Sequence, residues 1–84
     1  MAYYRMKKKF FEAKGEIAFR IWMFLLALEE FKKQKNQEKL DNLYTKVTAF
    51  SVSELVLDTA SEEEVAALEF IKKELRARGA VIKV

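Results

Sequence analysis

The chain of 84 residues has the size of a single small domain, covering residues 1–84, and it contains neither cysteine nor histidine. Disulfides and thiolate metal sites are therefore excluded, and the commonest metal ligand and general base are missing. Sixteen basic against 13 acidic side chains give a net charge of +3, too small an excess for a protein that coats nucleic acid.

The first predicted helix covers residues 3–35, and residues 1–16 form a basic and aromatic arm that is continuous with it. This helix holds nine basic and four acidic side chains, so the positive charge gathers at this end of the chain. Apolar residues recur at helical spacing from Met6 to Phe31. Gly15 is the weak point, because glycine costs about 1 kcal/mol relative to alanine within a helix, and it marks either a kink or a real break.

Residues 17–28 read IAFRIWMFLLAL, in which eleven of twelve positions are apolar and Arg20 is the exception. A surface helix has one apolar stripe, so a helix that is apolar on nearly all sides needs cover on all of them. An unbroken first helix would span about 50 Å and overhang a domain roughly 30 Å across. We therefore predict a homodimer or another protein partner along this helix. The predicted interface residues are Phe19, Arg20, Trp22, Met23, Phe24, Leu25 and Leu26.

The second predicted helix begins near Gln37, with Asn36 as its N-cap, and continues to Phe50. The structure of residues 51–59 is left open by the sequence, because serine and β-branched residues weaken the helical pattern. This segment continues the helix, forms a separate short helix or is extended.

The third predicted helix covers residues 62–78 and has the clearest boundaries. Ser61 and Glu64 have the spacing of a capping box, and Gly79 is the residue expected just beyond the end. The tail, residues 80–84, alternates apolar and polar side chains as a short strand does, and its pairing partner would be a symmetry-related tail, the segment before Asp58, or none. The sequence thus predicts an all-α fold of about three helices with a long N-terminal helix, with or without a short C-terminal β-strand, assembled as a helical homodimer.

Residues 52–84, VSELVLDTASEEEVAALEFIKKELRARGAVIKV, hold a short helical segment, a turn, a longer helix and a glycine followed by a tail. This order resembles the latter half of a winged-helix DNA-binding domain. The resemblance implies that Ser53–Leu57 is the short helix, Glu62–Arg78 the recognition helix and residues 79–84 the start of the wing. The recognition helix would begin with three glutamates, which disfavours its insertion beside DNA phosphates.

The alternative function is therefore a dimeric, winged-helix-like DNA-binding transcriptional regulator. Its contacts to nucleic acid would come from basic side chains on the first and third predicted helices, because lysine and arginine neutralise phosphates. The candidate contacts are Arg5, Lys7, Lys8, Lys9, Lys32, Lys33, Lys72, Lys73, Arg76 and Arg78.

The sequence contains no Ser/His/Asp set, phosphate-binding loop or dinucleotide fingerprint, so we predict a protein that is not an enzyme and uses no cofactor or metal. The apolar run is too short to span a membrane and lacks the cleavage site of a signal peptide, while an in-plane amphipathic anchor remains an alternative. The main prediction is a small cytoplasmic interaction module, acting as an inhibitor, adaptor or assembly factor, that works as an oligomer through its apolar first helix.

Overall fold

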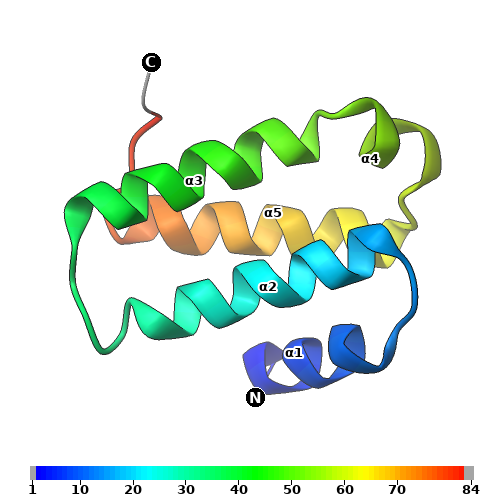
Figure 1. Ribbon diagram of the computed structural model, residues 1–84, viewed down its shortest axis with the longest axis horizontal. Helices are drawn as coiled ribbons and strands as arrows, with labels where there is room; N and C mark the ends of the chain where they lie inside the picture. The colour runs from blue at the N-terminus through cyan, green and yellow to red at the C-terminus, as the bar shows by residue number, and fades with distance from the viewer. Residues whose placement is uncertain (1, 83–84) are drawn as a thin grey trace.

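The computed structural model describes residues 2–82, which fold into five helices and contain no strand (Figure 1). The all-α prediction is confirmed. Of the predicted C-terminal strand, residues 80–82 are not a strand, and residues 83 and 84 lie outside the described residues. The elements are α1 (Ala2–Glu12), α2 (Glu16–Glu30), α3 (Gln37–Ser51), α4 (Glu54–Thr59) and α5 (Glu62–Ala77).

The core lies where α2, α3 and α5 meet. Figure 1 shows α5 running behind α2 and α3, with α1 along the outer edge of α2 and α4 at the corner after α3. α5 packs on both α2 and α3, and α1 packs on α2. The molecule is a flat body of 31 × 29 × 16 Å. The largest fully buried side chains come from the three central helices and are Ile21, Leu25, Leu28, Val47, Leu68, Ile71 and Leu75.

The predicted continuous helix over residues 3–35 is wrong, because α1 ends at Glu12 and α2 begins at Glu16. Gly15 has φ 120° and ψ 160°, a backbone region that is essentially restricted to glycine, so it marks a real break. The chain reverses there, and α1 folds back along α2 (Figure 1). Phe10 enters the core, and burial of such a ring is worth roughly 1.5–3 kcal/mol, which favours the folded-back arrangement. The overhang from which a partner was inferred is therefore absent from the described chain.

The predicted helix starts are confirmed by side-chain hydrogen bonds. The Asn36 side chain accepts a hydrogen bond from the Lys39 backbone N–H at 3.2 Å and caps α3. At the start of α5, Ser61 Oγ accepts from the Glu64 backbone N–H at 3.2 Å, and Glu64 Oε1 accepts from the Ser61 backbone N–H at 2.9 Å. The segment that the sequence left open contains α4, whose N-cap Ser53 accepts from the third residue of that helix.

The chain beyond α5 is fixed by Asp41, which is 7% exposed. Asp41 Oδ1 accepts a hydrogen bond from the Val81 backbone N–H at 3.0 Å and another from Gln37 Nε2 at 2.8 Å. The same Gln37 amide donates to the Gly79 carbonyl at 3.1 Å, so α3 holds the tail at two points. The Ala80 N–H bonds to the Leu75 carbonyl of α5 and the Val81 N–H to a side chain of α3, so these two backbone donors are satisfied without a neighbouring strand.

Candidate interaction surface

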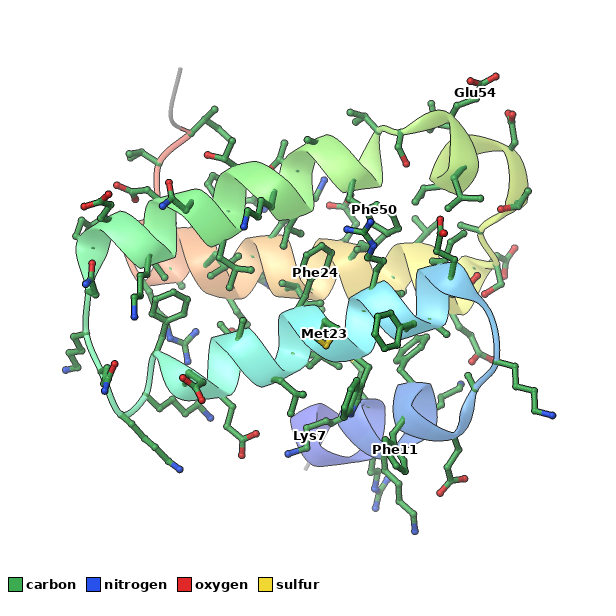
Figure 2. All side chains as sticks on the ribbon, viewed as in Figure 1. Lys7, Phe11, Met23, Phe24, Phe50 and Glu54 are labelled. Carbon is green, nitrogen blue, oxygen red and sulfur yellow. The ribbon has the colours of Figure 1, made fainter. Side chains whose placement is uncertain are left out.

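Large apolar side chains remain exposed on one face of α1 and α2. Phe11 on α1 is 66% exposed, and Phe19 and Met23 on α2 are 55% and 45% exposed. Trp22 is half-buried between the two phenylalanines, with ring centroids 5.4 Å from Phe11 and 6.3 Å from Phe19. Figure 2 shows Met23 in front of α2, with Phe11 on α1 below it. We call this surface the aromatic face, and its residues are Phe11, Phe19, Trp22, Met23 and Leu26.

The helical period of α2 explains how an almost uniformly apolar helix produces this face. One side, including Ile21 and Leu25, points into the core and is fully buried. A second side, with Trp22, is covered in part by α1. Phe19 and Met23 are one turn apart on the remaining side, which no described element covers.

The predicted interface residues divide between core and surface. Phe24 is 7% exposed and Leu25 is fully buried, so both pack inside the chain. Phe19 and Met23 lie on the aromatic face, with Trp22 and Leu26 half-buried beside them. Arg20 is exposed, and its guanidinium lies 5.6 Å from the centre of a phenyl ring on α3.

Phe11 was missing from the predicted interface because the sequence placed it in a basic arm on the same helix. Its role becomes visible only when α1 folds back and brings its ring to Trp22. The sequence signal for this arrangement is Gly15, which is compatible with either a kink or a break in the helix. A break followed by a reversal would have placed the arm's aromatic residues beside α2.

A groove between α2 and α3 adjoins the aromatic face. Its apolar lining comes from both helices, and lysines of α3 stand along one rim. We call it the lysine-rimmed groove, and its lining residues are Met23, Leu26, Ala27, Glu30, Phe31, Gln34, Lys39, Asn42, Leu43 and Lys46. A smaller hollow on the other side of α2 is lined by Lys7, Lys8, Phe11, Trp22 and Leu26.

An ion pair joins α1 to α2 beside this hollow. Lys7 Nζ donates a hydrogen bond of 2.8 Å to Glu29 Oε2. This hydrogen bond is the main reason that the pKa of the Glu29 carboxyl lies below its usual value; desolvation opposes the shift, and the charges of Lys33 and Lys32 add to it. Because the pKa is lowered in the folded chain, the stabilisation of α1 by this pair is complete above the ordinary carboxyl pKa. It is lost as the pH falls through the lowered value.

The structure divides the predicted nucleic-acid contacts into two groups. Lys7, Lys32 and Lys33 lie near Glu29, with Arg5, Lys8 and Lys9 on the same α1 helix. The others lie on α5 or at its end. Several are already engaged: Lys9 pairs with Glu63, Lys72 with Glu69 at 2.8 Å, Arg78 with Glu74 at 3.3 Å, and Arg76 donates to the Tyr44 hydroxyl at 3.4 Å. Lys73 is exposed on α5.

The helix that resembles a recognition helix, α5, is a central element of the core. One side of it packs against α2 and α3 and is fully buried at Leu68, Ile71 and Leu75. Its first turn holds the three glutamates, of which Glu62 and Glu63 are exposed. A short helix precedes it, as the resemblance implies.

Comparison with protein-family models, with curated proteins and with solved structures finds no significant match to this chain. Within residues 2–82, no group of three or more acidic side chains is placed to hold a metal ion. In the same part of the chain, no helix is both long enough and apolar enough to cross a bilayer.

Proposed function

We propose that the protein is a non-enzymatic interaction module that binds a partner protein through the aromatic face. The observation behind this proposal is the group of exposed apolar side chains around Trp22. Aromatic and methionine side chains are enriched in the centres of protein interfaces, where they dominate the binding energy. Clustered exposure of this kind on a small chain is typical of a docking surface.

The flat shape of the molecule supports the proposal. The chain exposes 5882 Å² of surface, whereas a compact monomer of its mass exposes about 5,200 Å². A stable interface buries roughly 800 Å² on each partner. The broad side of this body, 31 × 29 Å, is large enough to present that area in one piece.

The DNA-binding alternative has weaker support from the described residues. The first turn of α5 is acidic, and phosphates would meet Glu62 and Glu63 before any basic side chain of that helix. Lys72 and Arg78 already pair with carboxylates on their own helix. We therefore favour a protein partner over a nucleic acid.

The predicted homodimer stays a prediction, and the aromatic face is the surface through which two copies would meet. Because lysines stand on both sides of this face, salt should screen their repulsion and favour self-association. We expect light scattering to give a mass near the 9.9 kDa of one chain at low salt and a higher mass at high salt. A mass that falls as salt rises would contradict self-association through this face.

Docking on the aromatic face can be followed through Trp22, which is the one tryptophan of the chain. A synthetic amphipathic helix with leucines on one side and glutamines on the other is a suitable neutral probe. We expect its binding to shift the Trp22 emission to shorter wavelength and to saturate at micromolar concentration. The shift should be lost in Met23→Asp, because a charge on the apolar surface would be desolvated by the bound helix.

Leu57→Asp is the matched control, since Leu57 is exposed on α4 away from the aromatic face. This variant should bind the neutral peptide as the wild type does. Circular dichroism should show that both variants keep their helices, because both positions are exposed. An unchanged Trp22 emission across the wild-type titration, with no heat of binding in titration calorimetry, would refute the proposed function.

A further inference from the structure

We propose that the partner presents an amphipathic helix with an acidic flank, and that this helix docks in the lysine-rimmed groove. The inference rests on the proposed function and names the chemistry of the partner. Its basis is a groove between α2 and α3 with a partly apolar lining, together with two lysines of α3 on one rim that make no ion pair within the described residues. Helix-in-groove docking requires such a groove, with apolar anchors inserted at helical spacing.

The charge on the rim comes from Lys39 and Lys46 of α3. They are seven residues apart, so they lie on the same side of α3, separated by two turns or roughly 10 Å. Within residues 2–82 neither side chain makes an ion pair, whereas the lysines at α1 and α5 include several that do. A partner helix with two carboxylates seven residues apart would match both of them.

Besides these lysines, the lining holds apolar side chains and one carboxylate, Glu30, at the end of α2. Met23, Leu26 and Ala27 come from α2, and Leu43 comes from α3. Met23 is 45% exposed and therefore accessible to a partner, whereas Leu43 is only 8% exposed and is nearly buried. A helix that docks in a groove inserts apolar side chains against a lining of this kind.

The chain itself contains an example of helix docking on α2. α1 lies along the other side of α2, buries Phe10 in the core and pairs Lys7 with Glu29. In that contact the docked helix supplies the cation and α2 supplies the carboxylate. In the lysine-rimmed groove Lys39 and Lys46 of α3 set two positive charges against the one carboxylate of Glu30 on α2, so the docked helix has to supply carboxylates on the flank that faces α3.

Two other occupants match the groove less well. In a symmetric dimer the same face meets itself, so the lysine rims of both copies would approach each other. An anionic bilayer would satisfy the lysines and the exposed rings. A bilayer, however, offers no helix to insert between α2 and α3.

The test uses the full chain and two charged versions of the neutral probe, each about 18 residues or roughly 27 Å long. One carries glutamates seven residues apart along one flank, and the other carries lysines at the same positions. We expect the wild type to bind the glutamate peptide about tenfold more tightly than the lysine peptide, which corresponds to 1.4 kcal/mol. In Lys39→Glu/Lys46→Glu the preference should reverse.

Lys33→Glu/Lys73→Glu is the matched control, because it changes the net charge equally at exposed lysines outside the groove. It should keep the wild-type preference for the glutamate peptide. Equal affinity of the wild type for both charged peptides, with binding of the neutral peptide intact, would refute the acidic partner and leave the proposed function standing. The acidic partner is likewise refuted, and the proposed function stands, if vesicles of phosphatidylserine and phosphatidylcholine and the neutral peptide bind the chain while neither charged peptide does. Failure of all three peptides to bind would refute the proposed function itself.

Discussion

Replacing Leu25 with alanine is expected to lower the free energy of unfolding by about 2–5 kcal/mol. Leu25 is fully buried, so the substitution removes apolar contacts and leaves a cavity in the centre of the core. A domain of this size has a total stability of about 5–15 kcal/mol, so the loss is a large fraction of it. Urea unfolding followed by circular dichroism would measure the change.

Leu26→Ala is the control, because Leu26 is the next residue, belongs to the same residue type and is only half-buried on the aromatic face. We expect it to cost clearly less stability than Leu25→Ala. It should weaken binding of the glutamate peptide, whereas folded Leu25→Ala should bind that peptide normally. Equal destabilisation by the two substitutions would contradict the division of α2 into a core side and a docking side.

Replacing Gly15 with alanine is expected to cost about 1–3 kcal/mol, although nothing lies within 4 Å of an added Cβ atom. The cost is conformational, because the φ of 120° and ψ of 160° at this position are unfavourable for any side chain. The strain is relieved if α1 leaves its place and continues α2 as one helix. Phe11 would then separate from Trp22, and the Trp22 emission should shift to longer wavelength.

Lys14→Ala is the control for this substitution, since Lys14 is exposed, adjoins the break and has no positive φ. Its effect should stay within about 0.5 kcal/mol. Urea unfolding and the Trp22 emission spectrum would be recorded for both variants. A Gly15→Ala protein with wild-type stability and emission would show that the break does not depend on the glycine backbone.

The sequence predicted those parts of the fold that depend on neighbouring residues. The caps at Asn36 and Ser61 are local hydrogen-bond patterns, and both are confirmed. The reversal at Gly15 could not be predicted, because a glycine in a helix costs only about 1 kcal/mol and the outcome depends on where Phe10 is buried. Burial of that ring is a contact between segments, which helical periodicity does not describe.

The candidate surface was predicted in part for a related reason. A helix with apolar residues on nearly every side gives no periodic signal that separates core from interface. Phe19 and Met23 were therefore grouped with Phe24 and Leu25, although the first two are exposed and the last two are buried. Only the positions of α1, α3 and α5 around α2 decide which side stays uncovered.

Because α1 lies at the edge of the fold, we expect its local stability to be lower than that of the core formed by α2, α3 and α5. α1 packs chiefly on α2 and is tied to the rest by its buried Phe10 and by the pairs of Lys7 and Lys9. We therefore expect α1 to detach by a local opening at a lower free energy than global unfolding, which faster amide hydrogen exchange in α1 than in α2, α3 and α5 would show. Such an opening would uncover the side of α2 that carries Trp22, so the exposed apolar area of this chain would change with the position of one helix.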